Sequence, residues 1–299
     1  MRLSKIAHFF AELNHSPIQS TNLDSANRRE ISVDIKRDDL LHPIVSGNKW
    51  RKLKHVLLYI ESLGFRKVAV MGGPYSNLIH AIAYLANRLG WSIQLFIRGY
   101  PEQELTPMLL DAVRWGAKIT YVNRVDFKQM RQVRPELPED VFWIEEGGNS
   151  DLALKGTAEL LMEVSAEYDY IITATATGTT LAGLAVAVEK KKVDSKVLGI
   201  SVLNNAKQVS EDVGKLLNNN YQLPQLISGY EFGGYAKKSK ELIEFIHFFS
   251  AQNNIPLEPI YSGKSFYAVA DLIKRDYFPC KSKVLLLHCG GLQGARSQG

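Results

Sequence analysis

A lysine stands at the start of a predicted amphipathic helix. Residues 46–53 read Ser-Gly-Asn-Lys-Trp-Arg-Lys-Leu, and Ser46 and Asn48 are residue types that favour helix N-termini. Apolar residues then recur at helical spacing until Gly64. Lys49 therefore falls in the first turn, where the helix dipole disfavours an ammonium group. A lysine that is kept neutral there could form a Schiff base with an aldehyde.

The same segment also fits a solvent-exposed basic helix face. We expect Arg51, Lys52 and Lys54 to belong to such a face. The segment alone does not decide between the two interpretations for Lys49. The decision depends on whether other segments supply a site for an anion and a planar ring.

A glycine turn precedes a second predicted helix. Residues 72–77 read Gly-Gly-Pro-Tyr-Ser-Asn and lie between a predicted strand at 67–71 and a predicted helix at 76–89. Such a turn places Ser76 and Asn77 at a helix N-terminus, where backbone N–H groups can bind a carboxylate or a phenolate oxygen. An ordinary capped turn between a strand and a helix is the alternative.

A third turn is rich in hydroxyl groups. Residues 173–183 read Thr-Ala-Thr-Ala-Thr-Gly-Thr-Thr-Leu-Ala-Gly. Backbone amides and threonine hydroxyls at a helix start can hold a phosphate. The segment matches neither the P-loop nor the dinucleotide-binding glycine pattern. It therefore predicts an anion site without the nucleotide signatures.

Two tyrosines stand beside glycine turns. Tyr235 follows Gly233-Gly234, and Tyr261 comes shortly before Gly263. Interior packing with satisfied hydroxyls is one interpretation. The functional one is an aromatic surface against a planar cofactor, with phenol groups available for proton transfer.

Strand-like and helix-like segments alternate from about residue 66 and would position these turns. This alternation predicts a parallel sheet with helices on both faces. The uncharged stretch 170–188 is long enough to span a membrane. Its threonines and Gly178 instead favour a strand, a turn and a helix start. Residues 194–235 look rich in loops.

Composition limits the classes of protein to which the chain can belong. The chain has 299 residues, a net charge of +5, 45% hydrophobic residues and 22% charged residues. These values are typical of a globular protein of one large or two modest domains. Lysine and arginine are scattered among acids, so we expect no nucleic-acid partner. Two cysteines, Cys280 and Cys289, fit a reducing compartment. Because the N-terminus also lacks a signal-peptide pattern, we expect a cytoplasmic protein with no membrane anchor. The two cysteines lack zinc-site spacing, and we expect no metal site.

The reactive lysine, the anion turn and the tyrosines together indicate pyridoxal 5'-phosphate. The chain resembles the 1-aminocyclopropane-1-carboxylate deaminase and D-cysteine desulfhydrase family, which belongs to the tryptophan synthase β-like class. The family motif Gly-Asn-Lys-x-Arg-Lys-Leu appears at residues 47–53, and the likeness runs from about Lys36 to Gly291. It implies an α/β protein of fold type II, with two open twisted, mostly parallel sheets flanked by helices. It also implies a homodimer, a large domain formed by 1–50 and 164–299, and a smaller domain at 51–163.

The resemblance assigns roles to individual residues. Lys49 would hold the cofactor as a Schiff base, Ser76 would handle the substrate, and Asn77 would bond the ring oxygen. Tyr235 and Tyr261 match two active-site tyrosines, and Ser262 falls where the family places its partner for the pyridine nitrogen. The phosphate would be held by Ala176, Thr177, Gly178, Thr179 and Thr180.

Several residues depart from the family pattern. Tyr75 and Leu78 replace the glutamine and histidine that usually flank the Ser-Asn pair, and Thr179 stands where glycine or serine is usual. These changes concern the substrate more than the cofactor. The Glu-Glu-Gly-Gly segment at 145–148 also resembles a family loop, and its glutamates are expected at the surface without a catalytic role.

Position 262 favours one activity of the family. Cyclopropane-ring opening has no α-hydrogen to remove and needs a strong electron sink, which a carboxylate beside the pyridine nitrogen supports. The deaminases resemble one another in having a glutamate there, and this chain has Ser262. We therefore favour D-cysteine desulfhydrase-like β-elimination to pyruvate, ammonia and sulfide. In this hypothesis Lys49 or Ser76 takes the Cα proton, and the D configuration is implied by the family alone.

Three alternatives stay open. One is 1-aminocyclopropane-1-carboxylate deamination, which gives 2-oxobutanoate and ammonia. Another is a protein that binds pyridoxal phosphate with little catalysis. The third is a binding protein for a phosphate ligand without any Schiff base.

Overall fold

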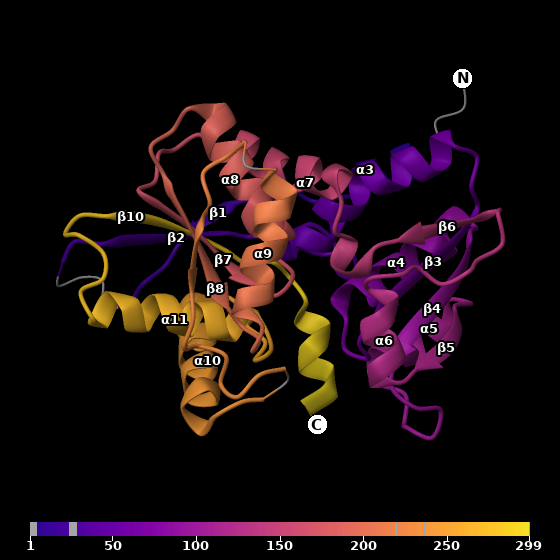
Figure 1. The fold of residues 1–299 in the computed structure, drawn as a ribbon. Helices are drawn as coiled ribbons and strands as arrows, with labels where there is room; N and C mark the ends of the chain where they lie inside the picture. Colours follow the sequence, from indigo (N-terminus) through magenta and orange to yellow (C-terminus); the bar gives the residue numbers. More distant parts are fainter. Residues whose placement is uncertain (1–4, 24–28, 219, 236, 299) are drawn as a thin grey trace.

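Two sheets organise the molecule (Figure 1). The structure is a computed structural model that describes residues 5–23, 29–218, 220–235 and 237–298. The larger sheet has the order β1-β2-β10-β7-β8-β9 and the smaller one β5-β4-β3-β6. Among the described strands, only β1 and β2 pair in an antiparallel manner. The predicted α/β fold with two mostly parallel sheets is therefore confirmed.

The strands of the two sheets come from different parts of the chain. The larger sheet contains β1 (Ile18–Ser20), β2 (Ser32–Lys36), β7 (Tyr170–Thr175), β8 (Lys196–Ser201), β9 (Gln225–Ile227) and β10 (Lys283–Leu287). The smaller sheet contains β3 (Lys67–Gly72), β4 (Ser92–Arg98), β5 (Lys118–Val122) and β6 (Val141–Ile144). The smaller sheet thus interrupts the larger one in sequence.

Helices cover both sheets. They are α1 (Lys5–Ala11), α3 (Asn48–Ser62), α4 (Asn77–Leu89), α5 (Pro107–Arg114), α6 (Arg124–Met130), α7 (Asp151–Ala158), α8 (Thr179–Lys191), α9 (Ala206–Leu217), α10 (Lys240–Asn253) and α11 (Ser262–Lys274). Short 3-10 helices are η1 (Asp38–Leu40), η2 (Glu146–Gly148), η3 (Glu159–Glu163) and η4 (Leu292–Gln298).

Helix α9 corrects one prediction. Residues 194–235 were expected to be rich in loops, yet α9 spans Ala206–Leu217. Its buried residues Val209, Val213 and Leu217 are four positions apart, which is one face of a helix. The surrounding asparagines and charges masked this short pattern.

The stretch 170–188 forms β7, a turn and α8, as predicted. Within the described residues, no helix is both long and apolar enough to cross a membrane.

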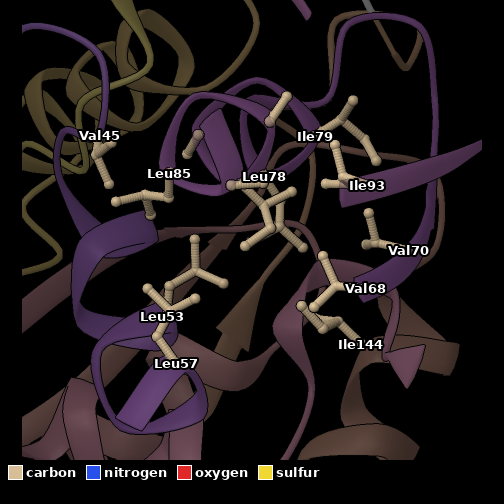
Figure 2. Close-up of a cluster of buried hydrophobic side chains, with 14 of the residues drawn as sticks. Val45, Leu53, Leu57, Val68, Val70, Leu78, Ile79, Leu85, Ile93 and Ile144 are labelled. Atoms are coloured by element: carbon tan, nitrogen blue, oxygen red, sulfur yellow. The ribbon is translucent and has the colours of Figure 1, made fainter. Parts of the chain in front are cut away.

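A hydrophobic cluster joins α3 to the smaller sheet (Figure 2). Leu53 and Leu57 of α3 face Leu78 of α4, and Val68 of β3 and Ile144 of β6 close the other side. The predicted domain boundary at residues 50 and 51 falls inside α3. Lys49 therefore belongs to a helix that packs against the smaller sheet, and the division into domains stays a prediction.

Candidate active site

The helix that carries Lys49 begins against the last strand of the larger sheet. Gly47 precedes α3 with a φ of 63°, in the left-handed region that favours glycine. A Cβ at this position would overlap the carbonyl oxygen of Cys289, just after β10. The backbone N–H of Gly47 donates to the carbonyl of Asp38 at 2.8 Å. The start of α3 is thus fixed by residues near both ends of the chain.

The Lys49 amine lies half-buried in a cavity. Its Nζ donates to Oδ1 of Asn48. Burial lowers the pKa of Lys49, while Cys289 and Glu258 act in the opposite direction. Because a neutral amine is the nucleophile in Schiff-base chemistry, this environment suits the role predicted for Lys49.

Arg51 and Lys52 are buried, so the prediction of a solvated face is wrong for both. Arg51 is 5% exposed and Lys52 is 3% exposed. The Arg51 guanidinium donates to Asp38 at 2.5 and 2.8 Å and to Glu163 at 2.8 and 2.9 Å. Carboxylates that compensate a buried charge lie far away in sequence, so helical spacing alone does not reveal them. Lys54 is only partly exposed and pairs with Glu159.

Lys52 points at the hydroxyl-rich turn. Its Nζ donates to the carbonyl of Gly147 at 2.9 Å and to Oγ1 of Thr177 at 3.3 Å. Burial first, and then the nearby charge of Lys49, lowers the pKa of Lys52 to about 7. Sequence reasoning missed this residue, although it lies three positions after Lys49 and so shares its helix face.

The turn before α8 leaves its helix start open. Gly178 is the N-cap residue, with a φ of 82°, and no side chain caps the helix. Nδ2 of Asn48 donates to Oγ1 of Thr180 at 2.9 Å, which ties the start of α3 to the start of α8. Thr179 is fully buried, and its Oγ1 has no hydrogen-bond partner among the described residues. Uncapped amides, hydroxyls and Lys52 together make a site for an anion.

The start of α4 forms another wall. Ser76 caps the helix, and its Oγ accepts from the backbone N–H of Ile79 at 3.4 Å. Oδ1 of Asn77 is buried without a partner in the described chain. Leu78 lines the cavity and also packs against Leu53 in the hydrophobic cluster (Figure 2). The departure at position 78 therefore puts an apolar core residue into the cavity wall.

Tyr235 and Tyr261 lie next to each other. Their hydroxyl groups are hydrogen-bonded, and the ring of Tyr75 lies 6.2 Å from that of Tyr235. Burial raises the pKa of both Tyr235 and Tyr261, so both phenols stay protonated. They are available as proton donors.

A buried carboxylate closes the start of α11. The side chain of Glu258 is fully buried and accepts from the backbone N–H groups of Ile260, Tyr261 and Ser262 at 2.7–2.8 Å. Oγ of Ser262 accepts from the Glu258 N–H at 3.0 Å and donates to Oε1 at 3.2 Å. Ser262 is therefore held by Glu258, a residue that sequence reasoning did not single out.

Lys264 fixes the loop that carries Tyr235. Its buried Nζ donates to the carbonyls of Val202, Glu231 and Gly234 at 3.1, 2.7 and 2.8 Å. Burial lowers the pKa of Lys264 to about 8. The loop with Tyr235 and the helix after Tyr261 are thus tied together.

One cavity with an empty volume of about 650 Å³ brings most of these residues together. Its lining includes Lys49, Lys52, Ser76, Asn77, Ala176, Thr177, Gly178, Thr180 and Tyr261. Thr179, Tyr235 and Ser262, which were predicted to belong to the site, are not part of this lining. Among the described residues, no carboxylate lines the cavity. The wall holds two lysine amines and several hydroxyl groups, which suits an anionic ligand.

The predicted surface loop at 145–148 contributes in a different way. Glu145 and Glu146 pair with Arg134 and Arg131. Gly147 lines the cavity, and a Cβ there would lie 2.8 Å from the Thr177 side chain. The glycine, rather than the glutamates, approaches the anion turn.

Comparison with known proteins gives matches over most of the chain. A family described as pyridoxal-phosphate dependent enzyme matches residues 14–290. A 1-aminocyclopropane-1-carboxylate deaminase from Rhizobium rhizogenes is 27% identical, over 88% of this chain and 87% of that protein. A Pyrococcus furiosus relative, whose name gives this activity as provisional, is 28% identical over 89% of this chain and 87% of its own. The crystal structure of a homologue of that deaminase superposes with a TM-score of 0.80 at 27% identity, over 98% of this chain and 97% of that one.

Proposed function

The chain belongs to the pyridoxal-phosphate dependent enzyme family, and we propose that it is a lyase that releases ammonia from D-cysteine by β-elimination. Within that family it belongs with the 1-aminocyclopropane-1-carboxylate deaminases and D-cysteine desulfhydrases, so its fold is type II and its cofactor is pyridoxal 5'-phosphate. Its choice of substrate is the subject of the proposal.

The residues of the cavity fit this cofactor. The start of α8 has no side-chain cap, and the ammonium of Lys52 lies beside it, which suits a phosphate. The buried Oδ1 of Asn77 has no partner within the described part of the chain. We propose that Lys49 would bond the aldehyde carbon and Asn77 the ring oxygen, and that Ser262, which is buried outside the cavity lining, would meet the ring nitrogen. Lys52 and residues 176–180 would hold the phosphate.

Each group of the chain has a separate task in the proposed reaction. The bound cofactor supplies an electron sink for the pair left at Cα. Lys49, whose pKa is lowered by burial, takes the Cα proton, and Ser76 is the other candidate base. Tyr235 and Tyr261 remain protonated and supply a proton to the departing sulfur. The balance is one D-cysteine and one water to pyruvate, ammonia and hydrogen sulfide.

The observation that carries this choice is the side chain at position 262. Ser262 stands where the ring-opening deaminases resemble one another in having glutamate, and no carboxylate lines the cavity within the described residues. A ring nitrogen without a carboxylate beside it is a weaker electron sink. D-cysteine has an acidic Cα proton and a good leaving group, so β-elimination from it can proceed with a weaker electron sink.

Deamination of 1-aminocyclopropane-1-carboxylate is the second candidate. The relative from Rhizobium rhizogenes bears this name. Glu258 also favours it, because the carboxylate accepts the Ser262 hydroxyl proton and leaves an oxygen lone pair that could accept from a protonated ring nitrogen. The carboxylate would then act on the ring through one hydroxyl.

Turnover of the two substrates separates the candidates. Purified holoenzyme is mixed with D-cysteine, L-cysteine or 1-aminocyclopropane-1-carboxylate, and sulfide, pyruvate and 2-oxobutanoate are followed. Sulfide and pyruvate from D-cysteine support the proposal. 2-Oxobutanoate as the main product transfers the assignment to the second candidate, and bound cofactor without any turnover overturns both.

The Ser262→Glu variant tests the electron-sink argument. A carboxylate at this position should raise ring opening relative to β-elimination by about tenfold, which corresponds to about 1.4 kcal/mol. Ser262→Thr keeps the hydroxyl group and should leave the ratio of the two activities near that of the natural chain. An unchanged ratio in Ser262→Glu would remove the argument from position 262.

We also propose that the protein is a homodimer and that it is cytoplasmic. A mass measurement of the purified holoenzyme in solution tests the homodimer.

A further inference from the structure

Lys264 donates its hydrogen bonds to backbone carbonyls alone within the described chain. Its side chain is fully buried at the third position of α11, and Nζ lies 2.7–3.1 Å from the carbonyl oxygens of residues 202, 231 and 234. An ammonium has three N–H groups, so the three carbonyls match them one to one. A buried cation is costly, and an apolar side chain could fill the same space. The backbone that Lys264 holds is therefore the feature to explain.

That backbone has an unusual conformation. Phe232 has a φ of 50°, in the left-handed region that disfavours residues with a side chain, and Gly233 and Gly234 also have positive φ. The N–H of Gly234 donates to the carbonyl of Glu231 at 2.9 Å and closes a turn. The Lys264 ammonium binds the carbonyls of both Glu231 and Gly234, so it fixes the two ends of this turn.

The turn ends directly at Tyr235. The hydroxyl groups of Tyr235 and Tyr261 are hydrogen-bonded, and Tyr261 lines the catalytic cavity whereas Tyr235 does not. A phenol has one proton, so Tyr261 can direct its proton into the cavity only if its oxygen accepts from Tyr235. Burial raises the pKa of Tyr261, and the hydrogen bond from Tyr235 acts in the opposite direction. The Tyr235 hydroxyl thus stabilises the phenolate that remains once Tyr261 has given its proton.

We infer that Lys264 is a positioning residue for protonation of the leaving group. Its ammonium holds Gly234, Gly234 places the Tyr235 hydroxyl on the Tyr261 oxygen, and Tyr261 donates to the departing sulfur. As the bond between Cβ and sulfur breaks, its electron pair goes to sulfur, which takes the Tyr261 proton, and solvent returns a proton to the phenolate. This inference rests on the proposed β-elimination and gives its two tyrosines unequal tasks.

The dependence on Lys264 should follow the basicity of the leaving group. Thiolate is a much stronger base than chloride, so the departure of sulfur gains from a proton donor and the departure of chloride does not. A general loosening of the protein would lower both eliminations together. The ratio of the two rates therefore separates a positioning role from a purely structural one.

Pyruvate formation from D-cysteine and from β-chloro-D-alanine is measured for each holoenzyme at saturating substrate. In Lys264→Met, kcat for D-cysteine should fall about tenfold relative to kcat for β-chloro-D-alanine. Lys264→Gln keeps two N–H donors and should shift this ratio in the same direction by less, and it carries the test if the methionine variant does not fold. Tyr235→Phe should shift the ratio about as much as Lys264→Met, and the double variant should shift it no further.

The matched control is Tyr230→Phe. The Tyr230 hydroxyl ties the same loop to α11 by donating to Asp271 at 2.7 Å, but it does so before the turn and not beside Tyr235. The ratio of the two rates should be unchanged in this variant. An equal shift in Tyr230→Phe and Lys264→Met overturns the inference, as does an unchanged ratio in both Lys264 variants or a further shift in the double variant.

Failure of the proposed function looks different, because the natural chain would then form no pyruvate from either substrate. In that case hydrogen exchange at the amides of residues 230–235 decides the inference. Faster exchange in the Lys264→Met holoenzyme than in Tyr230→Phe supports the fixing of the turn by Lys264, and equal exchange overturns it.

Discussion

Helices α8 and α11 both begin near the catalytic cavity, and they treat their first N–H groups in opposite ways. The start of α8 has a glycine N-cap and no capping side chain, with Lys52 beside it. The start of α11 receives the buried carboxylate of Glu258 on three backbone N–H groups. One helix start is left for an anion from outside the chain, and the other is closed by a carboxyl group of the chain, whose pKa is raised by burial while the three N–H groups act in the opposite direction. A helix start without a capping side chain is therefore as strong a sign of an anion site as the cations and hydroxyl groups around it.

Removal of the Glu258 carboxylate should have the largest effect on this contrast. Glu258→Ala leaves three buried N–H groups without an acceptor and should lower the free energy of unfolding by about 4 kcal/mol. Glu258→Gln keeps one acceptor oxygen and should lose about half as much. Chemical denaturation of the holoenzyme gives both values.

The control for this change is Glu244→Ala, which removes an exposed carboxylate paired with Lys240 at 3.5 Å on α10. A loss within about 0.5 kcal/mol is expected. If Glu258→Ala lowered the free energy of unfolding by as little as Glu244→Ala, the capping of α11 by Glu258 would not contribute to stability.

A carboxylate placed at the open helix start should make α8 resemble α11. In Thr177→Asp the new side chain pairs with Lys52 and repels the cofactor's phosphate, so cofactor affinity should fall about a hundredfold. The melting temperature of the cofactor-free protein should stay the same or rise, because the new carboxylate lies beside the uncapped N–H groups at the helix start. Equilibrium titration with pyridoxal phosphate and a thermal scan measure the two effects.

Thr177→Asn has nearly the same size without the charge, and it should weaken cofactor binding by less than about tenfold. Equal losses in the Asp and Asn variants would show that shape, and not charge, governs the open start.

The smallest expected effect is on the number of protons that the protein takes up when an anion binds beside Lys52. With a pKa lowered to about 7, Lys52 is mostly neutral at pH 8 in the cofactor-free protein. A bound dianion favours the ammonium form, so binding of sulfate at pH 8 should take up about 0.9 proton, against about 0.1 at pH 6. Calorimetry in buffers of different ionisation enthalpy measures this uptake. Lys52→Met should abolish most of it, whereas persistence of the full uptake would place the titration on Lys49.

The sequence predicted elements with long regular patterns and turns with unusual composition. The helix with Lys49 followed from its apolar spacing, and the turn before α8 from its run of hydroxyl residues. The burial of Lys52 was not predicted, because its amine donates to the carbonyl of residue 147 and the hydroxyl of residue 177. No local sequence pattern connects these residues to residue 52. Glu258 was missed for a related reason, since a single acid before a proline is ordinary until the turn that it caps is known.

Buried polar atoms without partners among the described residues were also beyond local reasoning. Nδ1 of His80 and Oε1 of Gln293 become conspicuous only when the other hydrogen bonds of these two side chains are counted. Unsatisfied valence is a property of the folded chain.

The position of β10 has a consequence for the order of events during synthesis. β10 lies between β2 and β7, so the N-terminal strands join the rest of the larger sheet only through residues 283–287. The start of α3 rests on the carbonyl of Cys289, just beyond that strand. Lys49, which is made early, therefore gains the support of its helix start only after residues 283–289 have been made and β10 has paired with β2 and β7.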